Sequence, residues 1–271
     1  MTPAALPETC DAEPRALAWI RPGQVGYVGP DLGADLHAAS VAVLTVGLDA
    51  PFTVQTGSRG SIITRSFYAP ARIPHRVVAP AGGRILLLFN DSADAPADRL
   101  AASMRRRLGP YGLDHAREAA LIEACADGGD PGELRALLAS ASDPTSASGE
   151  RWMHRHTDGR TDRRIERLVA EIRADPAQPR RAAQSAQALG LDRSHFLHLF
   201  ARQTGTSFRR YRQWCRVLHV VRGITAGHDL TRCAADAGFS SPSHLSDTFR
   251  QALGTTATTV FHSGVRFDLE D

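Results

Sequence analysis

Two stretches of the chain carry the same pattern of polar and aromatic residues. Residues 194–205 read SHFLHLFARQTG and residues 243–254 read SHLSDTFRQALG, so both follow S-H-Φ-x-x-x-F-x-x-x-x-G. At 100° per residue the Phe and Leu positions share one helix face, and serine, histidine and arginine side chains lie on or beside the opposite face. These polar groups can bind base edges and phosphates through hydrogen bonds. The pattern therefore favours binding over catalysis.

The chemistry of each outward side chain suits a particular contact with DNA. For one of them, Leu197, a role without DNA is equally ordinary. Leu197 can meet a thymine methyl group, although a single exposed leucine is common on any protein. His198 is suited to a contact with guanine or with a phosphate. The Asp247 carboxylate can accept a hydrogen bond from N4 of cytosine, but it repels the phosphate backbone of DNA. We expect Arg250 to bind phosphate. The residues predicted from the helix faces to contact DNA are Arg193, Ser194, Leu197, His198, Arg202, Ser243, Ser246, Asp247 and Arg250.

Both stretches follow the signature of a helix-turn-helix unit. A small alanine lets two helices cross closely, and a glycine four residues later takes the positive φ that ends the first helix. The second helix then begins at a cap, which is Asp192 in the first unit and Ser241 in the second. The alanine and glycine pairs are Ala186 with Gly190 and Ala234 with Gly238.

The helices that must position these faces follow from apolar periodicity and from stop signals. One long helix joins the two units and fixes the distance between them. If both units enter successive major grooves on one face of DNA, they are about 34 Å apart. The predicted helices span 162–173, 180–189, 192–203, 207–226, 230–237 and 241–253.

Composition limits the class of protein. The 271 residues allow two domains, and the formal charge is −4 over residues 1–150 and +7 over residues 151–271. All 32 basic residues are arginine, which we attribute to coding bias in a GC-rich genome, although arginine also suits bidentate contacts with phosphate and guanine. No apolar run approaches the ~20 residues that cross a bilayer, and the N-terminus lacks a signal-peptide pattern, so we expect a cytoplasmic protein. The four cysteines are far apart and are interpreted as small apolar residues.

Residues 24–90 consist of short Val-, Ile- and Thr-rich runs separated by Gly-, Pro- and Asp-rich turns. Such close spacing leaves no room for crossover helices and predicts an antiparallel barrel or sandwich. The fragment 69–89 resembles the second half of a cupin-type β-barrel, in which a Pro-rich turn presents a histidine, here His75, to the interior. His37 on an earlier strand is expected to face it. The resemblance predicts an effector pocket that contains both histidines.

A metal site at His37 and His75 is not predicted. Metal-binding cupins use a cluster of two histidines and a glutamate, whereas one histidine and no following glutamate stand here, and three ligands are the usual minimum. Residues 95–140 have helical periodicity, and we expect a helical connector that either mediates dimerisation or packs against the barrel. Residues 142–160 are rich in Ser, Asp and Gly and indicate a linker.

The C-terminal residues 160–260 resemble the DNA-binding domain of AraC/XylS-type transcriptional regulators. The matching residues are Ala186, Gly190, Phe196, Phe200 and Gly205, then Ala234, Gly238, Phe239, Leu245, Phe249 and Gly254. Carried over by position, the family's base-facing residues fall on Arg193, Ser194, Leu197, His198, Pro242, Ser243, Ser246 and Asp247. The second helix lacks the Gln and Arg often found there, which leaves the operator open. The family's N-terminal domain commonly senses a small molecule or mediates dimerisation.

The sequence thus predicts an α+β chain with a cupin-like sensor domain over 1–95, a connector over 96–141, a linker over 142–160 and a double helix-turn-helix domain over 161–260. We expect a sequence-specific transcriptional regulator without enzymatic activity or cofactor. Its expected partners are double-stranded DNA, a small-molecule effector, a second copy of the chain and, for an activator, RNA polymerase. The alternatives are a cupin-type metalloenzyme fused to a DNA-binding module and a non-specific architectural DNA protein.

Overall fold

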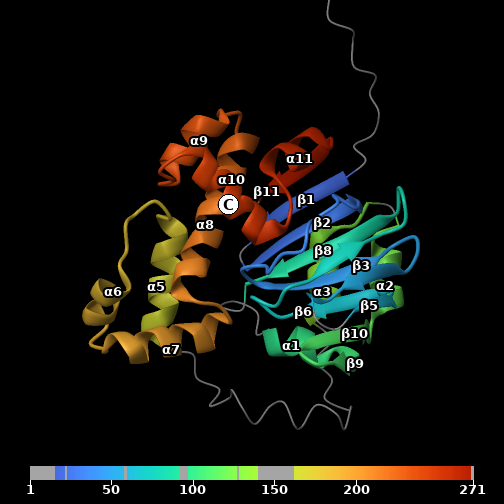
Figure 1. Ribbon diagram of the computed structural model, residues 1–271, viewed down its shortest axis with the longest axis horizontal. Coiled ribbons are helices and arrows are strands. Elements are labelled where there is room, and N and C mark those ends of the chain that lie inside the picture. The colour runs from blue at the N-terminus through green and yellow to red at the C-terminus, as the bar shows by residue number, and fades with distance from the viewer. Residues whose placement is uncertain are drawn as a thin grey trace, which may run out of the picture.

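The chain folds into a sheet domain followed by a helical domain, and the long helix α8 (Phe208–Thr225) lies between the other helices and the sheet (Figure 1). The computed structural model describes residues 16–21, 23–57, 60–91, 97–126, 128–139 and 162–269. The predicted linker over 142–160 lies outside these residues. Within the described part of the chain, no helix has the length and apolarity needed to cross a membrane.

Two sheets build the N-terminal half, in agreement with the predicted α+β class. The larger has the strand order β11-β1-β2-β8-β3-β6-β10-β9, and the smaller has the order β5-β4-β7. All pairs are antiparallel except β1 with β11, which is parallel. The strands are β1 (Ala16–Arg21), β2 (Gln24–Pro30), β3 (Ala42–Gly47), β4 (Phe52–Gln55), β5 (Ser61–Thr64), β6 (Ser66–Ala69), β7 (Arg76–Val78), β8 (Arg84–Asn90), β9 (Met104–Leu108), β10 (Tyr111–His115) and β11 (Val265–Leu269).

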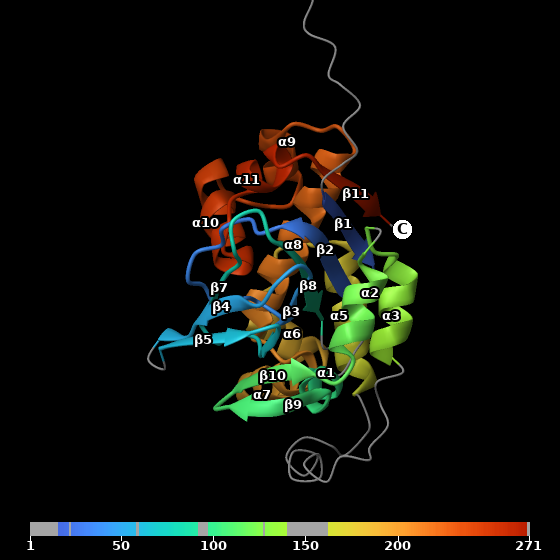
Figure 2. The same ribbon diagram turned by 90° about the vertical axis from the view of Figure 1, so that its right-hand side faces the viewer.

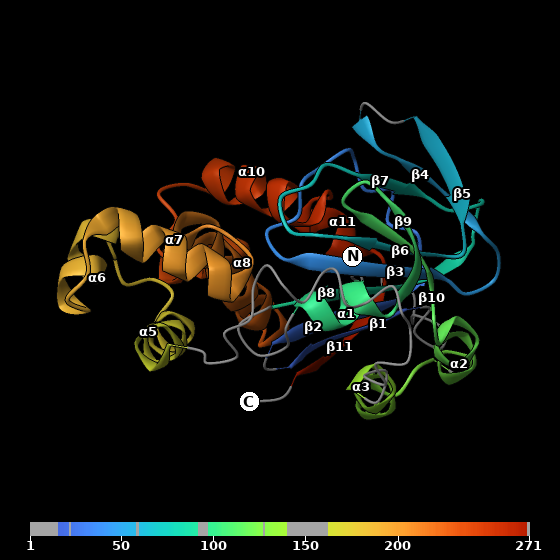
Figure 3. The same ribbon diagram turned by 90° about the horizontal axis from the view of Figure 1, so that it is seen from below.

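Both faces of the larger sheet are covered by other parts of the chain. Because successive side chains of a strand point to opposite faces, one strand contributes to the core on each side. Leu86 and Leu88 of β8 join a cluster with Trp19 and the helices α2 and α3, whereas Phe89 joins a cluster built mainly by the helical domain. Figure 3 shows α2 and α3 on one side of β1 and β2, with α5 to α8 lying apart from them. The helices of this half are α1 (Ala97–Ala102), α2 (Glu118–Ala124) and α3 (Pro131–Ala139).

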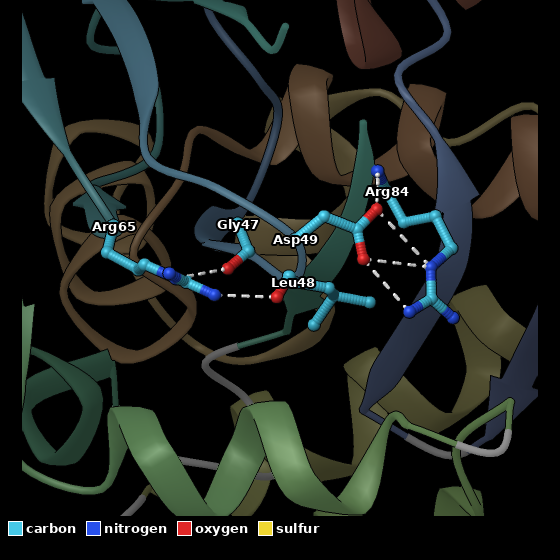
Figure 4. A network of polar contacts seen from close by, with 5 residues as sticks. All are labelled: Gly47, Leu48, Asp49, Arg65 and Arg84. Carbon is cyan, nitrogen blue, oxygen red and sulfur yellow. Dashed lines mark hydrogen bonds and ion pairs between the residues drawn. The ribbon is translucent and has the colours of Figure 1, made fainter. Parts of the chain in front are cut away.

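A charged corner closes the turn between β3 and β4 (Figure 4). Arg65 donates from Nε to the Gly47 carbonyl at 2.9 Å and from Nη2 to the Leu48 carbonyl at 2.7 Å. The Asp49 carboxylate accepts from the backbone N–H of Arg84 at 2.8 Å and from its Nη2 at 2.9 Å. The hydrogen bonds from Arg84 hold the pKa of Asp49 below its usual range. The turn is thereby tied to β8.

Residues 104–115 correct the predicted helical connector. They form the antiparallel hairpin of β9 and β10, which extends the larger sheet beyond β6. The arginine run 105–107 is exposed on β9, where charged side chains protect a sheet edge from pairing with another chain. The predicted helical periodicity in this region holds for α1, which precedes the hairpin, and for α2 and α3, which follow it. Three further elements were not predicted, namely β1, α11 and β11.

The six helices predicted for the helical domain agree with the structure to within two residues at each helix end. Its helices are α5 (Arg163–Ala174), α6 (Ala182–Ala188), α7 (Arg193–Thr204), α8 (Phe208–Thr225), α9 (Leu230–Asp236), α10 (Pro242–Leu253) and α11 (Ala257–His262). The chain then returns to the sheet domain, where β11 pairs with β1 beside α11 (Figure 2). Arg21 of β1 and Asp268 of β11 form an ion pair at 2.7 Å. The last strand therefore fastens the two domains together.

A buried polar network also joins the domains. The carboxylate of Asp91, just after β8, accepts from the Tyr211 hydroxyl at 2.7 Å and from Arg173 Nη2 at 2.7 Å. Arg173 Nε in turn donates to the Tyr211 oxygen at 2.8 Å. Beside this network the rings of Phe89 and Trp214 lie 5.7 Å apart. Polar and apolar contacts together fix α5 and α8 against the sheet.

Candidate DNA interface and interdomain cavity

The first helix-turn-helix unit consists of α6 and α7. Ala186 at their crossing is buried, and Gly190 in the turn has φ +66°. The Asp192 side chain accepts from the backbone N–H groups of Ser194 and His195 and so caps α7. Gly205 ends α7 in the left-handed conformation. The predicted cap and turn are confirmed.

The second unit consists of α9 and α10 and repeats these features. Ala234 is buried and Gly238 has φ +74°. Ser241 caps α10 by accepting from His244 N at 3.1 Å, and Pro242 occupies the first helical position, where no N–H is needed. The two units are therefore equivalent in local structure as well as in sequence.

The outward faces of α7 and α10 are exposed to solvent. Ser194 and Ser243, the equivalent residues of the two copies, both lie on the surface, while the Phe and Leu residues of the opposite faces are buried. Of the ten residues predicted to contact DNA, nine are exposed: Arg193, Ser194, His198, Arg202, Pro242, Ser243, Ser246, Asp247 and Arg250. They are exposed to solvent, and their contacts with DNA stay predictions.

Leu197 and His195 differ from the helical-wheel expectation. Leu197 is only partly exposed and packs against the core cluster of α5, α7 and α8. The helical wheel puts His195 at the rim of the Phe and Leu face and so predicts that it packs, but its side chain is exposed. Its counterpart His244 does pack, with its ring 5.3 Å from that of Phe239. A helical wheel separates buried from exposed residues least well at the edge of the buried face. A small rotation of the helix moves a residue there from one class to the other.

A groove of about 410 Å³ lies between α10 and the loop 35–38 of the sheet domain. Asp247 and Arg250, both predicted to contact DNA, form part of its wall. The loop is anchored next to the end of α10, because Asp35 N donates to the Gly254 carbonyl at 2.8 Å. The sheet domain thus borders the outward face of the second recognition helix. Sequence reasoning missed this contact, which joins segments far apart in the chain.

A second, more enclosed cavity lies between the larger sheet and the helical domain. The sheet contributes residues of β1, β2, β3 and β8, and the helical domain contributes Trp214 and Leu218 of α8 and Phe249 of α10. The free volume is about 100 Å³, compared with the ~10–15 Å³ that one water molecule needs. The lining is mostly apolar, and this is the environment in which small-molecule sites are built.

His37 and His75 meet at this cavity, as the sequence predicted. Their backbones form an isolated antiparallel bridge, and their ring centroids lie 5.0 Å apart. Both residues line the cavity. Nδ1 of each ring faces a backbone carbonyl, of Asp35 at 2.9 Å and of Ile73 at 3.0 Å, so Nδ1 carries the hydrogen and Nε2 is an acceptor. Their role in effector binding stays a prediction.

Burial sets the charge state of the histidines in the sheet domain. It lowers the pKa of His75 to about 4, against the hydrogen bond to Ile73, and it lowers the pKa of His37. Burial together with Arg117 and Arg105 also lowers the pKa of His115 to about 4. All three rings are therefore neutral at pH 7. Among the described residues, no group of three His, Cys, Asp or Glu side chains could hold a metal ion.

We expect acid to destabilise the fold between pH 6.5 and 4. In this window the unfolded chain protonates its histidines, with pKa near 6.5, while buried His75 and His115 stay neutral, so the free energy of unfolding falls as pH falls. From pH 7 to 5 each of the two contributes a loss of about 2 kcal/mol. Urea unfolding at both pH values checks this, and His75→Gln is expected to remove about half of the loss. An unchanged loss in the variant would contradict the assignment.

The described cysteines are Cys125, Cys215 and Cys233, and all three are buried free thiols. Burial raises the pKa of Cys125 and Cys215 to about 12, which keeps them protonated and unreactive. This agrees with their interpretation as small apolar residues. Cys10 lies outside the described residues.

Comparison with known proteins agrees with this architecture. A family profile described as "Helix-turn-helix domain" matches residues 185–263, which include α7 to α10. ToxT from Vibrio cholerae (P21 form) is similar at 13% identity, over 89% of this chain and 98% of that chain, with a TM-score of 0.56. ToxT with a bound unsaturated fatty acid aligns at 10% identity over 92% of each chain (TM-score 0.51). ToxT bound to (E)-4-(8-methylnaphthalen-1-yl)but-3-enoic acid aligns at 10% identity over 92% and 98%, with a TM-score of 0.52.

At these identities the likeness to ToxT shows the fold alone. It covers both domains, so the sheet domain followed by a helical domain is an arrangement that ToxT shares. No curated protein sequence matches the chain.

Proposed function

We propose that the chain is a transcriptional regulator of the AraC/XylS type, in which α7 and α10 read a specific DNA sequence and the sheet domain controls that binding. One observation carries the proposal. Two capped helices present equivalent exposed polar faces on a common scaffold, α8, in the more basic half of the chain. Recognition helices enter the major groove in this way.

The first unit supplies most of the base discrimination in this proposal. Its exposed face offers Arg193 and His198, which can bond to guanine, whereas the second offers Ser243 and Ser246, which bond to several bases. Arg250, an exposed residue in the last turn of α10, is the residue for which we propose a phosphate contact. Such contacts position a protein on DNA without specifying sequence.

Alanine variants of the full chain test this division of roles. Arg193→Ala and His198→Ala are expected to weaken binding to the selected site by ~1–3 kcal/mol and to leave binding to random DNA nearly unchanged. Arg250→Ala is expected to weaken both kinds of DNA alike and to reduce the dependence of affinity on salt. Fluorescence anisotropy at several salt concentrations measures both quantities.

Arg135→Ala is the matched control, because Arg135 is exposed on α3, on the other side of the larger sheet. It is expected to leave the ratio of selected to random affinity unchanged when the variant and the unmodified chain are compared in the same oligomeric state. If the three α7 and α10 variants lost the same affinity for selected and random DNA, the proposed roles would be wrong.

The proposed route of control runs from the cavity to α10. His37 lines the cavity and belongs to the loop 35–38, which borders Asp247 and Arg250 of α10. A ligand that displaces His37 would therefore move the loop beside the DNA-facing side of α10. This arrangement supports a small-molecule effector that changes the accessibility of the second recognition helix.

The remaining partners follow from the class of regulator. A second copy of the chain would double the DNA site, and the sheet domain with its helices α2 and α3 is the proposed dimerisation region. RNA polymerase is a proposed partner if the protein activates transcription. We propose no enzymatic activity, since the exposed polar residues of α7 and α10 are suited to binding DNA.

A further inference from the structure

The cavity between the larger sheet and α8 has an unusual balance of charge. Among its described lining residues there is no arginine, and the whole chain contains no lysine. The lining does contain one carboxylate, that of Asp31. Its oxygens already accept from Gly33 N at 3.0 Å and from Ala79 N at 2.9 Å. A negative ligand would therefore enter a mostly apolar space with an aspartate in its wall and no cation to pair with.

Burying an unpaired carboxylate is strongly unfavourable. The fatty acid and the butenoic acid in the ToxT structures both carry a carboxyl group. The charge of the present cavity disfavours ligands of that kind. A cationic ligand is disfavoured as well, because its charge would lose water in a mostly apolar space where the histidines are neutral and Asp31, which already accepts two backbone N–H groups, is the one carboxylate of the described lining.

The polar groups left over in the cavity are suited to hydrogen bonding. His37 and His75 have Nδ1 bound to backbone carbonyls, so Nε2 of each neutral ring is the remaining acceptor. Thr45 lines the same cavity and is fully buried, and its Oγ1 has no hydrogen-bond partner among the described residues. A buried hydroxyl without a partner is costly, and a ligand that bonds to it removes that cost.

We propose that this cavity binds a small, neutral and mostly apolar molecule that carries a hydrogen-bond donor, such as a phenol or an alcohol. The apolar part lies against the β-sheet, α8 and α10, and the donor binds among Thr45, His37 and His75. This inference rests on the proposed function, since it names the chemical class of the effector. The free volume of about 100 Å³ limits the ligand to roughly one ring or a short chain.

Four probes of similar size separate the alternatives: phenol, toluene, benzoate and benzylamine. Calorimetric titration of the full chain at pH 7 is expected to show phenol binding about five- to tenfold more tightly than toluene, as one added hydrogen bond gives. Benzoate and benzylamine are expected not to bind measurably. Binding of either ion as tightly as phenol, or of none of the four probes, overturns the proposal.

Thr45→Val removes the hydroxyl and keeps the shape of the side chain. It is expected to bring the affinity for phenol down toward that for toluene, while toluene binds as before. Ser40→Ala is the control, since Ser40 is buried next to β3 and outside the cavity lining, and it should leave the ratio unchanged.

An unchanged ratio of phenol to toluene affinity in Thr45→Val would contradict the role of Thr45 and the proposal with it. The readout is binding of the probe, so it is independent of DNA binding. If the unmodified chain showed no sequence-specific DNA binding, the proposed function would be wrong. If it bound benzoate more tightly than phenol, only the chemical class proposed for the ligand would be wrong.

Discussion

Asp91→Ala is expected to lower the free energy of unfolding by about 3 kcal/mol. The carboxylate is almost fully buried, with 6% of its side chain exposed, and it accepts from both Arg173 and Tyr211. Removing it takes a shared acceptor from a partly buried guanidinium and from a buried hydroxyl, which costs more than the net contribution of the contacts themselves. Urea unfolding at pH 7 measures the loss.

Asp49→Ala is the matched control for this prediction. Asp49 also pairs with an arginine, Arg84 at 2.9 Å, but the two side chains are 42% and 39% exposed. Exposed pairs of this kind contribute ~1 kcal/mol or less. If both variants lost the same free energy, the network at Asp91 would have no special role in holding α5 and α8 against the sheet.

Gly254→Ala is the second variant with a large expected effect. Gly254 ends α10 at φ +75°, where a residue with a Cβ costs roughly 1–2 kcal/mol. An added Cβ would also lie 2.4 Å from Nδ1 of His37 and 2.9 Å from Cβ of Ala34. The loop that carries these residues must move, and such overpacking adds ~1–3 kcal/mol.

Gly190→Ala separates the two contributions. Gly190 has nearly the same conformation, with φ +66°, in the turn of the first unit, but a Cβ there meets nothing within 4 Å. The free energy of unfolding of Gly190→Ala is expected to fall only by the cost of a Cβ in the left-handed conformation. The NMR signals of the His37 ring are expected to stay in place. Gly254→Ala is expected to shift those signals. Equal stability losses with an unmoved His37 ring would show that the loop does not pack on α10 as described.

The helical domain could be predicted from the sequence because its signals are local. Caps such as Asp192 and Ser241, and the glycines that end helices, act within four residues of the structure that they determine. The two outward faces followed from the period of the helix. The long helix α8 was predicted from its apolar periodicity, which describes one apolar face, yet it also buries Trp214, Val217 and Val220. It is covered on more than one side, and this depends on neighbours that no local pattern reveals.

The sheet domain was predicted less completely, because its contacts join distant segments. Strand β1 pairs with β11 at the far end of the chain, and Arg21 bonds to Asp268 across 247 residues of sequence. The hairpin of β9 and β10 was predicted as helix, since its arginine run has no alternation of polar and apolar residues. His37 and His75 were predicted to face each other, whereas the wall that α8 and α10 add to their cavity could not be foreseen.

Selection from a random DNA library with the full chain tests the central claim most directly. The account predicts enriched sequences with two conserved segments whose centres are separated by about one turn, ~10 base pairs, one for α7 and one for α10. It further predicts specific binding at least ~10³-fold tighter than binding to random DNA. Enrichment of a single segment, or a ratio of specific to random affinity near one, would contradict it.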